Sequence, residues 1–206
     1  MRFEDRVAVV TGGASGFGEA ISHRFAAEGA SVVVADRDAE GAHRVSRAIE
    51  SSGGRAVVSE VDVSQASQVA RMFETAAESF GGIDVIVNNA GFSHRSTPLV
   101  ELPEEEYDRV FDTNTKGVYL GAVYGVPYLR ERGGGSIVNL SSIMGLVGYP
   151  KGMGGGFNPY VPSKGGVLQF TRNLAIDSAS KGIRVNCICP GYVETNLTSA
   201  LTEDED

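Results

Sequence analysis

Short apolar runs alternate with helix-length segments along almost the whole chain, and this alternation restricts the fold more than any other feature. The runs are rich in valine and isoleucine and mostly lack polar alternation, which is typical of strands buried on both faces of a parallel sheet. Six runs have this character, at residues 7–11, 31–35, 56–61, 83–87, 136–140 and 183–188. Helical patterns lie between them, at 17–28, 39–51, 65–80, 104–128 (as two helices) and 160–180. The sequence therefore predicts an α/β fold with a doubly wound parallel sheet in three α/β/α layers.

The charge balance argues against nucleic acids and anionic membranes as partners. The chain has 18 Lys and Arg against 26 Asp and Glu, a net charge of −8, whereas those partners need a positive field. Four charged residues precede the apolar run at 7–10, so no signal-peptide apolar region forms there. We expect a cytoplasmic chain without membrane contact. Since no repeat or linker divides its 206 residues, we also expect one domain spanning 1–206.

The cysteines and histidines do not predict a metal site or a disulfide framework. Cys187 and Cys189 lie two positions apart at the end of the last run, where strand geometry would place both on one face, so we interpret them as core or pocket-edge thiols. His23, His43 and His94 are far apart and show no i, i+4 pairing.

A glycine-rich turn follows the first run and precedes a helical pattern. Ligands of doubly wound sheets bind at the carboxyl ends of the strands, where this turn, Thr-Gly-Gly-Ala-Ser-Gly-Phe-Gly at 11–18, is expected to lie. Glycines let the backbone turn tightly and approach a pyrophosphate at the N-terminus of the helix. The spacing differs from Gly-x-Gly-x-x-Gly, so a plain turn is the alternative. The turn is not a P-loop, because Gly-Lys-Ser/Thr is absent.

Asp36 directly follows the second run and ends that predicted strand, 18 residues after Gly18. A carboxylate there can accept hydrogen bonds from a ribose 2′-hydroxyl and repels a 2′-phosphate, which favours NAD over NADP. Arg37 weakens this argument, because an arginine beside the ribose can stack on adenine or pair with a phosphate.

Two further strand ends carry polar or small residues. Asp62 and Val63 follow the third run, where an adenine contact and a carboxylate at a helix N-terminus are equal alternatives. Asn-Asn-Ala-Gly at 88–91 follows the fourth run, and turn formation alone would explain its asparagines.

Tyr160 and Lys164 lie four positions apart at the start of a predicted helix, and therefore on one face. An ammonium beside the phenol favours phenolate, so we expect the pKa of Tyr160 to be lowered and Tyr160 to serve as a general acid/base. Pro162 is tolerated because first-turn amides lack intrahelical partners. An exposed amphipathic pair is the alternative.

The motifs taken together resemble one family. They are Thr-Gly-x-x-x-Gly-x-Gly, Asp36, Asn-Asn-Ala-Gly, Asn114, Ser142, Tyr160-x-x-x-Lys164 and the segment from Pro190 to Thr195. Their order is that of the short-chain dehydrogenase/reductase family, which the chain resembles over nearly its whole length. The resemblance implies a Rossmann-like fold, no metal, and a homodimer or homotetramer.

The resemblance also implies a role for each motif residue. Tyr160 would protonate a carbonyl oxygen or deprotonate an alcohol, and Ser142 would bond the substrate oxygen. Lys164 would hold the nicotinamide ribose and lower the Tyr160 pKa, and Asn114 would complete a proton relay through water. The implied cofactor-binding residues are Gly12, Ser15, Gly16, Phe17, Gly18, Asp36, Arg37, Asp62, Val63, Asn88, Asn89, Ala90, Gly91, Tyr160, Lys164, Pro190, Gly191, Val193 and Thr195.

The chain departs from the family pattern between Ser142 and Tyr160, which are 18 positions apart, several more than usual. The extra residues either form a surface insertion or bring Met153 and Phe157 to an apolar part of the substrate. Ser141 stays an alternative to Ser142 as the substrate-facing serine. The chain is also shorter than its relatives, and we expect that a substrate lid and a last strand are missing.

Three glycines at 117, 121 and 125 share one face of a predicted helix, which permits close approach of another backbone. They serve either core packing or, as the resemblance implies, a subunit interface formed with the helix of Tyr160. Pro127 is expected to end or kink this helix.

The sequence predicts an NAD(H)-dependent oxidoreductase that interconverts a secondary alcohol and a ketone. One alternative is a non-catalytic dinucleotide-binding regulatory module, against which the set Asn114, Ser142, Tyr160 and Lys164 argues. The other is a 3-oxoacyl thioester reductase that uses NADPH.

Overall fold

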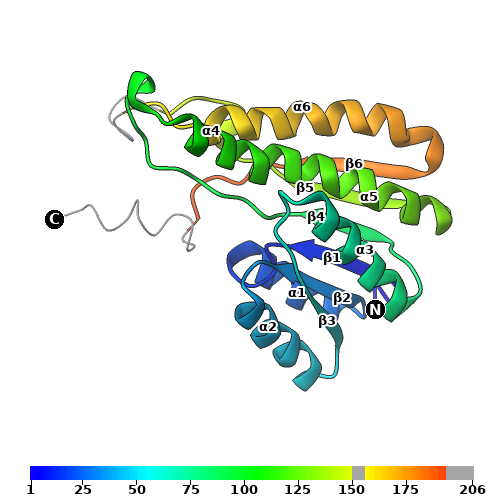
Figure 1. Ribbon diagram of the computed structural model, residues 1–206. Coiled ribbons are helices and arrows are strands. Elements are labelled where there is room, and N and C mark those ends of the chain that lie inside the picture. Colours follow the sequence, from blue (N-terminus) through cyan, green and yellow to red (C-terminus); the bar gives the residue numbers. More distant parts are fainter. Residues whose placement is uncertain (150–155, 194–206) are drawn as a thin grey trace.

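The computed structural model describes residues 1–149 and 156–193, which form a parallel sheet covered by helices on both faces (Figure 1). The strands are β1 (Val7–Thr11), β2 (Ser31–Asp36), β3 (Arg55–Glu60), β4 (Val85–Asn88), β5 (Gly135–Leu140) and β6 (Ile183–Ile188). Their order in space is β3-β2-β1-β4-β5-β6, and every neighbouring pair is parallel. The predicted doubly wound sheet is confirmed, with strand boundaries shifted by at most two residues.

The strand order reverses between β1 and β4. The chain first builds outward from β1 to β3 and then returns to add β4, β5 and β6 on the other side. Two neighbouring strands whose connections leave in opposite directions open a crevice at their carboxyl ends, where ligands of such sheets bind. In this fold the crevice is therefore expected between the loops that follow β1 and β4.

The helices are α1 (Gly16–Ala27), α2 (Ala39–Ser51), α3 (Ala66–Phe80), α4 (Glu104–Phe111), α5 (Gly117–Glu131) and α6 (Tyr160–Ser178). One face of the sheet packs on α1 and α2 through a cluster that includes Val10, Val34 and Ile49. The other face packs on α3, α5 and α6 around Phe73 and Ile86. Alternate residues of each strand thus belong to opposite cores, as the uninterrupted apolar runs predicted.

The face of α5 that carries three glycines lies against its own sheet and its neighbouring loops. A Cβ at Gly117 would meet Val63, one at Gly121 would meet the Asn88 side chain, and one at Gly125 would meet Ile86 and Phe73. These glycines therefore serve core packing, which was one of the two alternatives in the sequence.

Of the two predicted effects of Pro127, an end of α5 is not found, because the helix continues to Glu131, and a kink stays a prediction. Proline removes only the hydrogen bond to the carbonyl of Val123, one turn earlier. Leu129, which is fully buried beyond the proline, anchors the last turn in the core and compensates for that loss.

A short π-helical turn, Asp112–Lys116, joins α4 to α5. The predicted pair of helices at 104–128 is therefore confirmed, and the junction between them positions a buried side chain. A π-turn widens the helix by one residue and often marks a functional site. Here it turns Asn114, which is fully buried, toward the start of α6. None of the helices in the described part of the chain has the length and hydropathy needed to cross a bilayer.

Candidate active site

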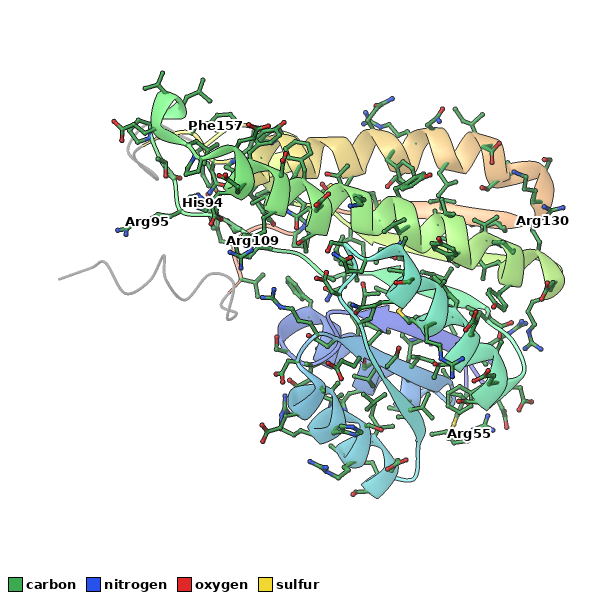
Figure 2. All side chains as sticks on the ribbon, viewed as in Figure 1. Arg55, His94, Arg95, Arg109, Arg130 and Phe157 are labelled. Carbon is green, nitrogen blue, oxygen red and sulfur yellow. The ribbon has the colours of Figure 1, made fainter. Side chains whose placement is uncertain are left out.

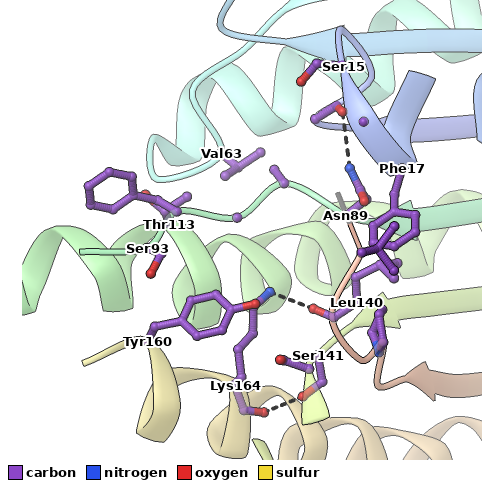
Figure 3. Close-up of a pocket in the computed structure, with 18 of the residues that line it drawn as sticks. Ser15, Phe17, Val63, Asn89, Ser93, Thr113, Leu140, Ser141, Tyr160 and Lys164 are labelled. Atoms are coloured by element: carbon purple, nitrogen blue, oxygen red, sulfur yellow. Dashed lines mark hydrogen bonds between the residues drawn. The ribbon is translucent and has the colours of Figure 1, made fainter. Parts of the chain in front are cut away.

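A cavity of about 400 Å³ opens at the carboxyl ends of the strands, with walls from the loops after β1 to β6 (Figure 3). Most of the residues predicted from sequence line it. They are Gly12, Ser15, Gly16, Phe17, Asp36, Arg37, Asp62, Val63, Asn89, Ala90, Gly91, Ser142, Tyr160, Lys164, Pro190, Gly191 and Val193. Gly18, Asn88 and Asn114 are not among the lining residues but contact segments that form the walls. Thr195 and Met153 lie outside the described residues.

The glycine-rich turn is shaped so that side chains are excluded. Gly12 has a φ of +65°, and a Cβ there would lie 2.8 Å from Asn89 Nδ2. A Cβ at Gly18 would collide with the Gly12 carbonyl, so the turn packs directly onto the first turn of α1. The Ser15 side chain does not cap α1 within the described structure, which leaves the first amides of the helix for another acceptor. This arrangement fits the pyrophosphate of a dinucleotide.

Asp36 is held in place by two backbone amides at the end of β2. Ala14 N donates to Oδ2 and Asp38 N donates to Oδ1, each at 3.0 Å. The carboxylate therefore joins the glycine turn to the start of α2 while it lines the cavity. Exposed Arg37 lines the same end of the cavity, so both groups that the sequence weighed for NAD and NADP are present there.

Asp62 fixes a turn and also lines the cavity, so its adenine contact stays a prediction. Its Oδ1 accepts from the backbone amide and the hydroxyl of Ser64, at 2.9 and 2.7 Å, which fixes the turn before α3. The residue also lines the cavity beside Val63.

The two asparagines after β4 have different surroundings. Asn89 donates to the carbonyls of Thr11 and Gly12, at 2.9 and 3.2 Å, and so ties the glycine turn to β4. Asn88 points into the core, where it donates to Asn139, which in turn donates to Thr171 of α6. Asn88 thus braces the sheet below the cavity.

Ser142 lies beside Tyr160 at the end of β5, and its side chain is hydrogen-bonded to the phenol. Ser141 also lines the cavity, but its hydroxyl donates to the Lys164 carbonyl at 2.7 Å. Of the two serines that the sequence left open, Ser142 is therefore the one next to the phenol.

Lys164 is buried, and its Nζ donates to the Leu140 carbonyl at 2.7 Å (Figure 3). The ammonium lies 5.5 Å from the centre of the Tyr160 ring. Burial disfavours the charged amine and lowers its pKa to about 8, so Lys164 is mostly charged at neutral pH.

The pKa of Tyr160 is raised, whereas the sequence predicted that it would be lowered. Burial of the phenol raises it, and the hydrogen bond with Ser142 opposes this only in part. The Lys164 ammonium is bonded to Leu140 and not to the phenol, so it does not reverse the effect of burial. In this structure Tyr160 is a protonated phenol.

Asn114 uses its whole amide to join three segments. Its Oδ1 accepts from Phe92 N at 2.7 Å, and its Nδ2 donates to Phe92 O and to Ser163 Oγ, both at 2.9 Å. The Ser163 hydroxyl donates in turn to the Tyr160 carbonyl at 2.7 Å. Both side-chain N–H groups of Asn114 are thus used to hold the cavity wall against α6.

Several cavity residues were not predicted from sequence. They are Asp38, Val61, Phe92, Ser93, Thr113, Leu140, Ile143 and Met144, while Tyr149 and Tyr192, which also line the cavity, belong to segments that the sequence placed near it. Those around Tyr160, among them Phe92, Ile143, Met144 and Tyr149, form a small apolar cluster with it. Most directly follow or flank the motif residues, and position after a strand was the signal that could have found them. Phe157, for which a substrate contact was one of two alternatives, pairs with Thr97 in an antiparallel bridge and is not among the residues that line the cavity.

In the described ranges, no group of three or more His, Cys, Asp or Glu side chains is placed to hold a metal ion. Cys187 and Cys189 are half-buried free thiols. Burial raises the pKa of Cys187, and the neighbouring Cys189 raises it further.

The comparison with known families decides what this cavity belongs to. The model of the short chain dehydrogenase family matches residues 6–206. The chain belongs to the short-chain dehydrogenase/reductase family. It is therefore an oxidoreductase of the family that acts on alcohol groups with a nicotinamide dinucleotide, NAD or NADP.

Individual relatives agree with this family. The chain is 38% identical to the 3-oxoacyl-[acyl-carrier-protein] reductase of Thermotoga maritima over 98% of its own length and 80% of the relative's. It is 41% identical to the cis-4-hydroxycyclohexanecarboxylate dehydrogenase of Sinomonas cyclohexanicum, over 98% and 79% of the two chains. A solved short-chain dehydrogenase/reductase from Mycobacterium marinum superposes with a TM-score of 0.92 at 32% identity, over 98% and 78%.

Proposed function

We propose that this family member is an NAD(H)-dependent oxidoreductase that interconverts a secondary alcohol and a ketone, with Tyr160 as the general acid/base. The observation that carries the proposal is the meeting of Tyr160, Ser142 and Lys164 in one cavity with the glycine turn. A purely regulatory dinucleotide-binding module has no need of a buried phenol and a buried amine beside a serine.

The dinucleotide supplies the acceptor or donor of the hydride, and the chain supplies the proton. In reduction, Tyr160 donates its phenolic proton to the carbonyl oxygen, and its raised pKa keeps that proton available at neutral pH. Ser142, which is hydrogen-bonded to the phenol, would bond the same substrate oxygen. In oxidation, Tyr160 accepts the alcohol proton, and the nearby charge of Lys164 stabilises the phenolate that accepts it.

Asn114 acts in this proposal by holding the wall of the site. The relay through water that the resemblance implied stays a prediction, and both side-chain N–H groups of Asn114 donate to Phe92 and Ser163. Through these bonds Asn114 fixes the segment after β4 relative to the backbone of Tyr160.

Asp36 supports NAD as the preferred dinucleotide. Its carboxylate is fixed at the rim of the cavity by two amides and would repel a 2′-phosphate. Arg37, exposed at the same rim, is the group through which NADP would be accepted.

The substrate is proposed to carry an apolar portion next to the reacting carbon. Phe92, Ile143 and Met144 line the cavity around Tyr160 and offer it an apolar wall. Two relatives are named for cyclic alcohols, a hydroxycyclohexanecarboxylate and cyclohexanol. A 3-oxoacyl thioester is the second candidate, supported by the name of the Thermotoga maritima relative.

The test is a panel of secondary alcohols, cyclohexanols and 3-hydroxyacyl thioesters, each offered with NAD⁺ and with NADP⁺. Formation of reduced nicotinamide is followed by absorbance. We expect turnover of at least one alcohol, with a higher kcat/KM for NAD⁺ than for NADP⁺. Binding of dinucleotide without turnover of any panel member would instead favour the regulatory module, and a preference for NADP⁺ would overturn the argument from Asp36.

We also propose a homodimer or homotetramer assembled through the outer faces of α5 and α6. Tyr119 and Val123 of α5 and Ile176 of α6 are large apolar side chains left exposed there, Ile176 to 80%. Such residues indicate a surface that is covered in an assembly. Sedimentation velocity of the chain and of an Ile176→Glu variant tests this, since a monomer in both would contradict it.

A further inference from the structure

Asn158 lies two positions before Tyr160, at the end of the segment that leads into α6, and it is nearly fully buried. We propose that Asn158 is a positioning residue that holds Tyr160 and the segment 92–97 in a fixed relation, so that the phenol and the substrate wall keep their geometry. The proposal rests on the proposed function, because it concerns how the general acid/base is held.

The two ends of the Asn158 amide bond to different segments. Its Oδ1 accepts from Tyr160 N at 2.9 Å, and its Nδ2 donates to the His94 carbonyl at 2.7 Å. The amide of the first residue of a helix has no intrahelical partner. The side chain of Asn158 supplies that partner, and in doing so it links the start of α6 to a loop 64 positions away.

Tyr160 is thus held on both sides of its backbone by asparagine side chains. Asn158 accepts from its N–H, while Ser163 Oγ donates to its carbonyl at 2.7 Å and is itself held by Asn114. Asn114 and Asn158 also share a second task. Asn114 holds the 92–97 segment at Phe92, and Asn158 holds the same segment two residues later at His94.

Further contacts fix the outer end of the segment. Thr97 and Phe157 exchange two backbone hydrogen bonds, Thr97 N to Phe157 O at 3.0 Å and Phe157 N to Thr97 O at 2.8 Å. The Arg109 guanidinium lies over the Phe92 ring, 4.3 Å from its centre. His94, Arg109 and Phe157 lie near one another at this end of the molecule (Figure 2).

The segment matters because it forms part of the cavity wall. Phe92 and Ser93 line the cavity next to Tyr160, whereas His94 and Asn158 lie behind them. A shift of the segment would therefore move the apolar wall, and a shift of α6 would move the phenol. Asn158 touches neither the reacting atoms nor the cavity, so its effect on the reaction is carried entirely by these two neighbours.

Two substitutions separate the two bonds of Asn158. Asn158→Asp keeps an oxygen that accepts from Tyr160 N but places a second oxygen against the His94 carbonyl. The bond to the segment 92–97 is therefore lost, whereas the bond that positions Tyr160 remains. Asn158→Ala loses both bonds. The exposed Asn173 of α6 gives the matched control, Asn173→Ala.

For Asn158→Asp, we expect KM for the alcohol to rise about tenfold while kcat changes by less than about threefold. For Asn158→Ala, KM rises by a similar factor and kcat also falls about tenfold, because small displacements of reacting groups cost large factors in rate. The control keeps both constants. A merely structural role would lower the amount of active enzyme without this split between KM and kcat.

Hydrogen–deuterium exchange gives a readout that does not depend on turnover. Peptides covering 92–97 should exchange faster in both Asn158 variants, peptides covering 156–164 faster only in Asn158→Ala, and β1 at an unchanged rate in every variant. If exchange and both kinetic constants match the control, the proposal is overturned. If no alcohol is turned over by the unmodified chain, the proposed function fails, and the exchange pattern still decides whether Asn158 links the two segments.

Discussion

One side of the cavity is formed mainly by backbone groups and the other mainly by buried polar side chains. At the ends of β1 and β2, the site is shaped by the absence of side chains, at Gly12 and Gly18, and by backbone amides that hold Asp36. At the ends of β4 and β5 and the start of α6, it is shaped by buried polar side chains, with Asn114 and Lys164 almost inaccessible to solvent. Backbone groups are sufficient for the side that binds the dinucleotide. The side that transfers a proton needs side chains held in a fixed geometry.

This difference predicts that substitutions on the two sides fail in different ways. Changes on the backbone side should weaken dinucleotide binding, and changes on the side-chain side should slow turnover of the bound complex. The predictions below test that division, from the largest expected effect to the smallest.

Tyr160→Phe removes the proton donor without changing the volume of the buried ring. We expect kcat to fall by about 10²–10⁴-fold, the range for loss of a general acid/base. The dissociation constant of the dinucleotide, measured by calorimetry, should stay within about threefold of the unmodified value. Tyr107→Phe, at an exposed position on α4, is the control and should keep full turnover.

Gly18→Ala tests the opposite side. Its Cβ would collide with the Gly12 carbonyl and push the glycine turn away from α1. We expect the dinucleotide dissociation constant to rise by about 10–100-fold, equivalent to about 1.4–2.8 kcal/mol. Turnover at saturating dinucleotide should fall much less. Gly148→Ala, where a Cβ would meet nothing within 4 Å, should leave binding unchanged, and equal loss in both variants would refute the argument.

Asp36→Asn tests the choice of dinucleotide. The amide removes the charge that repels a 2′-phosphate, while its carbonyl can still accept from one of the two amides that hold Asp36. The ratio of kcat/KM for NAD⁺ to that for NADP⁺ should fall about tenfold, or about 1.4 kcal/mol. The exposed Asp177→Asn on α6 should not change the ratio. An unchanged ratio in both variants would remove Asp36 from the explanation of cofactor preference.

The smallest effect concerns stability and pH. Burial lowers the Lys164 pKa from 10.5 to about 8, so between these values the unfolded chain binds more protons at this group than the folded chain. Stability therefore rises with pH in this window. The free energy of unfolding of the unmodified chain, minus that of Lys164→Met, should increase by about 1 kcal/mol from pH 8 to pH 9. Urea titrations at the two pH values measure it, and a difference that falls or stays flat would contradict the burial argument.

The backbone side of the site could be predicted from the sequence because its parts are local. The glycine turn follows β1 directly and Asp36 is the last residue of β2, and strand ends of a parallel sheet meet at one edge. Tyr160 and Lys164 were found because four residues make one helical turn. These signals need no knowledge of tertiary contacts.

The side-chain side was predicted only in part because its support comes from distant segments. The hydrogen bond between Asn158 and His94 joins residues 64 positions apart, and no sequence periodicity predicts it. The pKa of Tyr160 depends on burial by Met144 and Val110, which the spacing to Lys164 does not reveal. The path of α5 through Pro127 likewise depended on the burial of Leu129.

The most direct test of the proposed reaction follows the carbon-bound hydrogen of the alcohol. The chain is incubated in ordinary water with the dinucleotide and an alcohol that carries deuterium on the carbinol carbon, and the reduced dinucleotide is analysed by mass spectrometry. Because the proton leaves through Tyr160 and the carbon-bound hydrogen leaves as hydride, one deuterium should be found in each reduced dinucleotide. Ketone formation with an unlabelled dinucleotide would contradict the account.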